Sequence, residues 1–285
     1  YFIQFARHLI YSTSMPPAQA CALRVALQQV RKGDDLREQL QHNVQLFRRG
    51  LADTRLQLMA SDSAIQPFSR AANSYDIVAA FQRLCGEKLL ARVSNYEGLK
   101  VLDAGCGTGF FSRRFRHAGA QVIALDLAAG MLEKSRGNDS ADEYVLADIE
   151  HIPLPDGSVD LCFSNLAIQW CSSLHAALAE MHRVVKPGGK VVFSSLAQGS
   201  LAELAQAWQQ VDGKTHTNQF LAFEAIKLAC APFSHDLQLT QETEFYPDVM
   251  TLMKSLKGIG ATHLHQGRDS GLTSRGRFER LASVY

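Results

Sequence analysis

The 285-residue sequence lacks several features that mark particular classes of protein. It has no excess of one charge, because 29 Lys and Arg side chains are balanced by 28 Asp and Glu side chains, and this argues against a nucleic-acid partner. It has no apolar run close to the roughly 18 residues that predict a membrane span. The first residues do not have the pattern of a signal peptide. We therefore expect neither a nucleic-acid nor a membrane partner.

The six cysteines form no recognisable framework. They are scattered, with no Cys-x-x-Cys pair and no Cys/His spacing typical of a zinc site. We expect neither a structural metal nor disulfides, and reduced thiols predict a cytoplasmic protein. Hydrophobic residues make up 46% of the chain and charged residues 20%, which is enough to build a packed core.

Two unlike segments make up the chain. Residues 1–67 hold 8 basic and 5 acidic side chains, whereas residues 68–285 hold 21 and 23. In the first segment a Pro-Pro pair at 16–17 ends one predicted element, and apolar residues follow a helical period from Ala18 to Gly50. An amphipathic helix needs a partner for its apolar face, so this segment is predicted to be a loosely packed helical fragment.

Residues 5–20 read Phe-Ala-Arg-His-Leu-Ile-Tyr-Ser-Thr-Ser-Met-Pro-Pro-Ala-Gln-Ala. They resemble 8-amino-7-oxononanoate synthase, a pyridoxal-phosphate enzyme of biotin synthesis, and the similarity extends to about Pro67. In that family the Schiff-base lysine precedes this string, so the resemblance implies a segment without its catalytic lysine. Thr13 could retain a cofactor contact, but an inactive fragment is the favoured interpretation.

The second segment opens with a strand, a glycine-rich turn and a helix. Residues 99–104 predict a short buried strand, Gly-Cys-Gly-Thr-Gly follows at 105–109, and residues 110–117 have helical spacing. Glycines in this context let backbone N–H groups approach a ligand closely. Asp103 precedes them, and its charge would repel a pyrophosphate but favour a cationic amino-acid group.

Polar side chains also end the next three predicted strands. Asp126 follows the second strand, and its carboxylate suits the two hydroxyls of a ribose. Asp148 follows the third strand and could accept from an adenine amino group while Ile149 packs on the ring, and Asn165 follows the fourth. Each residue alone could belong to a solvated loop or turn. Together they predict one ligand site, because the carboxyl ends of parallel strands meet at one edge of the sheet.

The string Asp-Ala-Gly-Cys-Gly-Thr-Gly at 103–109 resembles the first motif of the class I S-adenosylmethionine-dependent methyltransferases, and Glu-Met-His-Arg-Val-Val-Lys-Pro-Gly-Gly at 180–189 resembles their turn into the fifth strand. The resemblance implies an α/β fold with a Rossmann-like sheet, and S-adenosyl-L-methionine as cofactor. Arg183 would hold its helix in place rather than touch substrate. The cofactor-binding residues that the resemblance implies are Asp103, Gly105, Cys106, Gly107, Gly109, Asp126, Leu127, Met131, Asp148, Ile149 and Asn165.

Three further strings, at 164–171, 198–204 and 255–265, are more specific. They resemble the malonyl-acyl-carrier-protein O-methyltransferase family of biotin synthesis, and the similarity covers residues 68–285. It implies methyl transfer from S-adenosyl-L-methionine to the free carboxylate of malonyl-acyl-carrier protein or malonyl-CoA. Three alternatives stay open: a quinone-type C-methyltransferase, a fusion that binds the donor without turnover, and a pyridoxal enzyme, which the missing lysine disfavours.

The implied reaction sets the substrate-side candidates. A carboxylate is already ionised at neutral pH, so no general base is needed, and a cation that grips it loosely would suffice. Residues 68–76 resemble the lid helix of the family, where Tyr75 could orient the donor or simply pack. The candidates are Tyr75, Lys257 and His263 as catalytic residues, and Gln169, Trp170, Lys254 and Arg268 as substrate-binding residues.

The end of the chain supports two further expectations. Residues 254–280 contain six basic and two acidic side chains, which suits docking of an acidic carrier protein or is only a basic surface. Methyltransferases of this class have strand order 3-2-1-4-5-7-6, and we place strand five at Lys190–Ser195 and strand six near Glu242–Tyr246. The last strand is expected to be missing, which would leave strand six unpaired or displaced against strand five.

Overall fold

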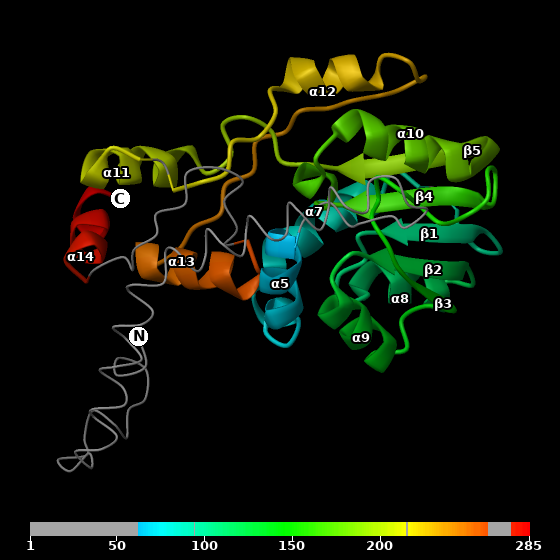
Figure 1. Ribbon diagram of the computed structural model, residues 1–285, viewed down its shortest axis with the longest axis horizontal. Helices are drawn as coiled ribbons and strands as arrows, with labels where there is room; N and C mark the ends of the chain where they lie inside the picture. Colours follow the sequence, from blue (N-terminus) through cyan, green and yellow to red (C-terminus); the bar gives the residue numbers. More distant parts are fainter. Residues whose placement is uncertain (1–61, 94, 215, 262–274) are drawn as a thin grey trace, which may run out of the picture. The chain divides into compact units, whose positions relative to one another are not determined.

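The computed structural model describes residues 62–93, 95–214, 216–261 and 275–285 (Figure 1). Nearly all of the first predicted segment lies outside these residues, Thr13 included, and so do His263 and Arg268. The described residues all belong to one compact unit, Met59–Tyr285. Helix α5 (Asp62–Ala71) continues across the boundary expected at 67/68, and that division stays a prediction.

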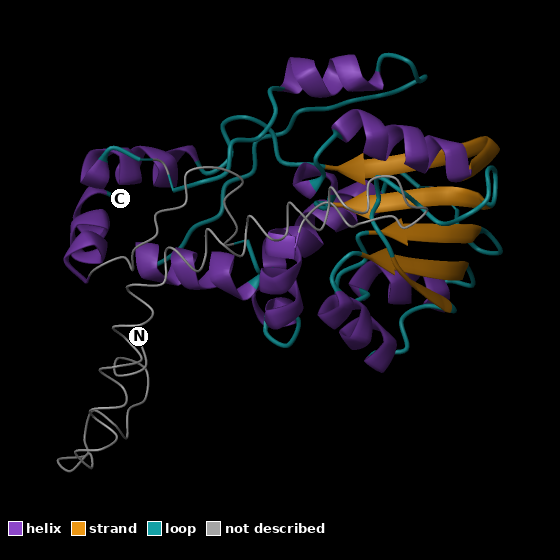
Figure 2. Cartoon of the chain, viewed as in Figure 1, coloured by secondary structure: helices purple, strands orange, loops and turns teal. Residues whose placement is uncertain are grey.

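One parallel sheet forms the centre of this unit, with strand order β3-β2-β1-β4-β5 (Figures 1 and 2). The order confirms the Rossmann-like fold of the class. It reverses between β1 and β4, and ligands of such sheets bind beyond the carboxyl ends of the strands at that reversal. The strands are β1 (Lys100–Ala104), β2 (Gln121–Asp126), β3 (Glu143–Leu146), β4 (Val159–Asn165) and β5 (Val185–Ser194).

Successive residues of a strand have their side chains buried on opposite faces of the sheet. Val101 and Phe163 belong to a core cluster that includes residues of the helices α7 (Ala80–Leu90), α8 (Phe110–His117) and α9 (Ala129–Gly137). Leu102 and Ile123 belong to the opposite cluster, which includes residues of α10 (Leu174–Val184). Because both faces are covered, the strands read as continuous apolar runs rather than as alternating ones.

Helices connect the strands and cover both faces. No helix in the described part of the chain is both long enough and apolar enough to cross a membrane. Besides α5, the described helices are α6 (Tyr75–Val78), α7 (Ala80–Leu90), α8 (Phe110–His117), α9 (Ala129–Gly137), the 3-10 helix η1 (Ile168–Trp170), α10 (Leu174–Val184), α11 (Ala202–Asp212), α12 (Phe223–Cys230), α13 (Val249–Gly258) and α14 (Arg275–Val284).

The region beyond β5 differs from the sequence expectation. Residues 234–246 are described but form neither helix nor strand, so the prediction of a strand near Glu242–Tyr246 is wrong. A strand needs a ladder of backbone hydrogen bonds, and among the described strands β5 pairs only with β4. A side-chain contact joins residues 234–246 to α7 instead: Lys88 forms an ion pair with Glu242. β5 also begins earlier than predicted, at Val185, with an irregular register against β4.

Candidate functional site

The glycine-rich turn after β1 has three left-handed glycines, Gly105, Gly107 and Gly109, with φ of +80°, +55° and +82°. A Cβ atom on Gly105 would lie 2.3 Å from the Cβ atom of Ala167, and one on Gly109 would lie 2.3 Å from the Ser140 hydroxyl oxygen. A Cβ atom on Gly107 would have no atom within 4 Å among the described residues. The outer glycines therefore permit close packing, and the middle one borders open space.

Most of the backbone N–H groups in this turn already donate hydrogen bonds to protein oxygens. The backbone nitrogens of Gly105 and Cys106 donate to the Leu125 carbonyl at 2.8 and 3.0 Å. The Gly107 nitrogen donates to the Asp126 carboxylate at 2.8 Å. The sequence suggested that these N–H groups approach a ligand, but the structure uses them to join β1 to the end of β2. The turn therefore gives the site its shape, while most of its N–H groups are already bonded within the protein.

Asp126 ends β2 beside this turn and is half-buried. One carboxylate oxygen accepts from the Gly107 nitrogen and the other from the Ala128 nitrogen, both at 2.8 Å. Burial raises the pKa of this carboxyl, and backbone hydrogen bonds from Ala128, Gly107 and Leu127 oppose that rise. Backbone N–H groups thus hold the carboxylate at the edge of the sheet where the sequence predicts the ribose contact.

Asp103 lies deeper than its motif suggests. It is only 2% exposed, and the Ser112 hydroxyl of α8 donates to its carboxylate at 2.5 Å. Burial raises the pKa of Asp103 to about 7, and the Ser112 hydrogen bond opposes the rise. Sequence reasoning missed Ser112, whose only signal is a small polar residue on the buried face of a predicted helix.

The remaining donor-site candidates gather around the same edge. Ile149 is buried, and its Cδ1 atom lies 3.5 Å from where a Cβ atom on Gly105 would stand. The neighbouring Asp148 is half-buried and accepts from the Glu150 nitrogen at 2.9 Å. Asn165 at the end of β4 donates to the Gln82 carbonyl at 2.9 Å and accepts from the Ser194 hydroxyl at 2.8 Å. It therefore connects β4, α7 and β5.

Three potential metal ligands also lie near this edge, since oxygen and sulfur atoms of Asp148, Glu150 and Cys171 are within 4.8 Å of one another. Glu150, however, accepts from the backbone nitrogens of Ser172 and Ser173, each at 2.8 Å. Burial raises the pKa of the Cys171 thiol, and the nearby Glu150 adds to the rise. A protonated thiol is a poor ligand, so the group is better explained as a support for the turn before α10.

Helices α5 and α6 cover the turn and Asp126. Tyr75 packs against a buried cluster that includes Met131, and burial together with the nearby Asp126 raises the pKa of its hydroxyl. The Phe68 and Trp170 rings pack in a T-shaped contact, with centroids 5.1 Å apart. The family resemblance implied a lid here, and that role stays a prediction. The predicted Leu127 is half-buried and directly follows Asp126, after the end of β2.

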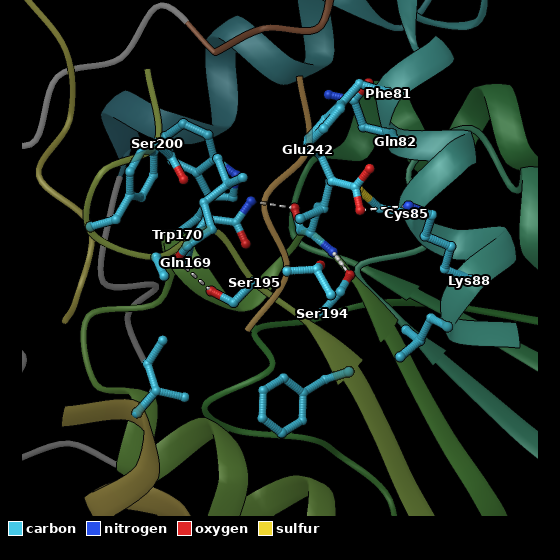
Figure 3. A pocket seen from close by; sticks show the side chains of 18 of the residues that line it. Phe81, Gln82, Cys85, Lys88, Gln169, Trp170, Ser194, Ser195, Ser200 and Glu242 are labelled. Atoms are coloured by element: carbon cyan, nitrogen blue, oxygen red, sulfur yellow. Dashed lines mark hydrogen bonds and ion pairs between the residues drawn. The ribbon is translucent and has the colours of Figure 1, made fainter. Parts of the chain in front are cut away.

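A cavity of about 2270 Å³ adjoins α5 and α6 (Figure 3). Residues of α7, the η1 region and β5 line it, together with residues of α10, α11, α12, α13 and the segment 234–246. Tyr75, Gln169 and Trp170 line it, as the substrate-side expectation requires. Lys254 and Lys257 are exposed on α13 and are absent from its described lining. Sequence reasoning missed Gln82, Cys85 and Ser194, which also line the cavity. The first two follow helical spacing, but nothing in that spacing marks a cavity wall.

Comparisons with known proteins agree with this geometry. Residues 102–193 match the family model described as a methyltransferase domain, and residues 1–107 match the model of aminotransferase class I and II, as the resemblance of the first segment implied. The chain is 59% identical over 218 residues to the malonyl-[acyl-carrier protein] O-methyltransferase of Serratia marcescens, covering 76% of this chain and 86% of the relative. It is 56% identical over 218 residues to that of Yersinia pestis, covering 76% and 82%.

Solved structures resemble parts of the chain. An S-adenosylmethionine-dependent methyltransferase from Mesorhizobium loti is 33% identical, with a TM-score of 0.38, and the match covers 42% of this chain and 56% of that one. The fold assignment rests on the strand order of the sheet and not on this partial likeness.

Proposed function

Because the chain belongs to the malonyl-[acyl-carrier protein] O-methyltransferase family, we propose that it transfers a methyl group from S-adenosyl-L-methionine to the free carboxylate of malonyl-acyl-carrier protein. The observation that carries the proposal is the 59% identity to a relative of which the chain covers 86%. The described cysteines are free thiols, which supports a reducing cytoplasm as the location.

We place the methyl donor at the edge where β1, β2 and β3 end. Open space beside Gly107 and the carboxylate of Asp126, held at the end of β2 by backbone N–H groups, support this placement. Asp126 would accept the ribose hydroxyls, and Ile149 would pack on the base with Asp148 beside it. When bound, S-adenosyl-L-methionine supplies a methyl group activated by its positive sulfur.

The acceptor side needs alignment rather than a base. A malonyl carboxylate with a pKa of about 4 is ionised at neutral pH, so its oxygen can take the methyl group without losing a proton. The chain contributes by holding the oxygen in line with the methyl group and by excluding water. Tyr75 and Trp170 would do both, since each lines the cavity and belongs to or touches the lid.

The decisive experiment is a methyl-transfer assay with the purified chain. Malonyl-acyl-carrier protein should gain one methyl group, detected by mass spectrometry, and acetyl-acyl-carrier protein, which lacks the free carboxylate, should gain none. Transfer to a quinone-ring precursor instead would support the C-methyltransferase alternative. Binding of S-adenosylhomocysteine without any transfer would support the alternative of a donor-binding protein without turnover.

A further inference from the structure

Two glycines, at the end of α13 and just after it, lie against α5 and α6 (Figure 1). Gly258 is the last residue of α13, and a Cβ atom on it would lie 2.6 Å from Cγ2 of Val78, the last residue of α6. Gly260 has a φ of +80°, and a Cβ atom on it would lie 3.0 Å from the Cα atom of Phe68 in α5. Both distances are shorter than ordinary carbon contacts of roughly 3.5–4.0 Å, so the approach depends on glycine.

A hydrogen bond joins the same three helices. The Ser74 hydroxyl, directly before α6, lies 3.3 Å from the Gly258 carbonyl oxygen and 3.1 Å from the Ala71 carbonyl oxygen, and it donates to both. Ala71 is the last residue of α5. Because the bond to Gly258 is already long, a small separation of α6 from α13 would break it. The position of α6 thus depends on how closely α13 approaches.

These contacts lead to the two side chains assigned to the acceptor side of the site. Ser74, which bonds to Gly258, directly precedes Tyr75. Phe68, which Gly260 approaches, packs against the Trp170 ring. One intervening residue therefore separates each glycine from a side chain proposed to align the acceptor.

Residues 255–261 are the described part of one of the three strings that resemble the family most specifically. The sequence offered Lys257 from that string as a catalytic residue, but the structure exposes it on α13, outside the described cavity lining. The glycines of the string, and not its cation, are the residues that contact α5 and α6.

We propose that Gly258 and Gly260 are positioning residues, which let α13 seat α5 and α6 and so fix the places of Tyr75 and Trp170. The proposal rests on the proposed function for the roles of those two side chains. A larger residue at 258 would push α6 away by about 1 Å, because a valine side chain rotates with difficulty. A misplacement of this size near the reacting atoms can slow a reaction by about two orders of magnitude.

Gly258→Ala tests the proposal cleanly. Gly258 ends a helix and does not have a left-handed φ, so alanine adds a methyl group without straining the backbone. In this variant kcat for methyl transfer to malonyl-CoA should fall by about tenfold or more. Affinity for S-adenosylhomocysteine should fall severalfold, and amide exchange in α6 should accelerate.

Val78→Ala provides a rescue, because it removes both Cγ atoms that the new methyl group would meet and leaves only the Cβ atom, at 3.6 Å. Combined with Val78→Ala, the Gly258→Ala change should alter kcat by no more than about twofold. Comparing the two variants that share Val78→Ala cancels any cost of that substitution. A loss of equal size with and without Val78→Ala, or no loss at all, would overturn the proposal.

Gly137→Ala is the matched control. Gly137 also ends a helix, α9, without a left-handed φ, and a Cβ atom on it would meet no described atom within 4 Å. It should leave kcat, donor affinity and exchange in α6 unchanged, and a defect as large as that of Gly258→Ala would count against the proposal. Thermal unfolding checks that each variant is folded.

Amide exchange in α6 separates this proposal from the proposed function, since it is measured without an acceptor. Faster exchange in Gly258→Ala that Val78→Ala reverses supports the positioning role even if no malonyl thioester is methylated. Ser74→Ala removes the bond to Gly258 without adding an atom and should also accelerate exchange. Exchange unchanged in both variants overturns the positioning role even if methyl transfer is intact.

Discussion

The Thr108 hydroxyl of the glycine-rich turn donates to the Asp76 carboxylate of α6 at 2.6 Å. Thr108 is buried, whereas Asp76 is exposed. The bond therefore joins the glycine-rich turn of the proposed donor site to α6, the helix that the family resemblance predicts to be part of a lid.

Thr108→Val keeps the shape of the side chain and removes this bond, so the lid should open more often. We expect affinity for S-adenosylhomocysteine to fall by about 0.5–1.5 kcal/mol and amide exchange in α6 to accelerate. Calorimetry and hydrogen exchange measure the two effects. Thr108→Ser retains the hydroxyl and should behave like wild type; if α6 exchanged equally fast in both variants, the bond would not hold the lid.

Asp126→Ala removes the proposed ribose acceptor and should weaken S-adenosylhomocysteine binding by about 1–3 kcal/mol, because charge-assisted hydrogen bonds are lost. Isothermal titration calorimetry gives the affinity. Asp160→Ala is the matched control, since Asp160 also accepts from a backbone nitrogen, that of Lys100, where β1 begins. An unchanged affinity in Asp126→Ala would end the ribose assignment.

Asp103 should make stability depend on pH. Its pKa is about 7 when folded and near 4 when unfolded, so between those values the folded chain binds a proton that the unfolded chain has released. Its contribution to stability therefore falls as pH rises from about 4 to 7. Asp103→Asn lacks this titration, so its free energy of unfolding relative to wild type should rise by on the order of 4 kcal/mol between pH 4 and 8.

Urea unfolding at several pH values measures that difference. Asp160→Asn should not reproduce it, because the Lys186 hydrogen bond lowers the pKa of Asp160, and the stability from that carboxylate is lost only as pH falls through its lowered pKa. A gap between wild type and Asp103→Asn that stays constant across pH would contradict the raised pKa.

Arg183 confirms the sequence expectation that it holds its helix in place. Its guanidinium donates to the carbonyls of Ile152 and Leu154, each at 2.8 Å, and pairs with Glu180 at 2.7 Å. Arg183→Ala should lower the free energy of unfolding by about 1–3 kcal/mol and leave donor affinity unchanged. Thermal unfolding and calorimetry measure these quantities. A variant with native stability but weaker donor binding would assign Arg183 to the site instead.

Lys254 and Lys257 are exposed on α13 and outside the described cavity lining, which favours docking of an acidic carrier over a grip on the malonyl carboxylate. The double variant Lys254→Ala/Lys257→Ala should raise KM for malonyl-acyl-carrier protein severalfold at low salt, with a smaller effect at high salt. KM for malonyl-CoA should not change. Equal increases in KM for both substrates would instead support direct binding of the malonyl carboxylate by these lysines.

Much of the fold and of the donor edge follows from local pattern. Strands buried on both faces read as apolar runs, and a residue such as Asp126 that ends such a run must lie at the carboxyl edge of a parallel sheet. The strand expected near Glu242 failed because strand formation depends on a partner, and a partner is not a property of the segment itself.

The sequence by itself determined the positions of the first four strands, the edge where polar residues collect and the family, because these depend on hydrophobic period, turn residues and residue identity along the chain, whereas the sheet order was implied only by the family resemblance. Only the tertiary structure decided that the glycine-turn N–H groups bond to Leu125 and Asp126, that Asp103 is buried against Ser112, and that Gln82 and Gln169 share one cavity wall. Each of these depends on distances between residues far apart in the chain, and those distances exist only once the packed core brings the elements together.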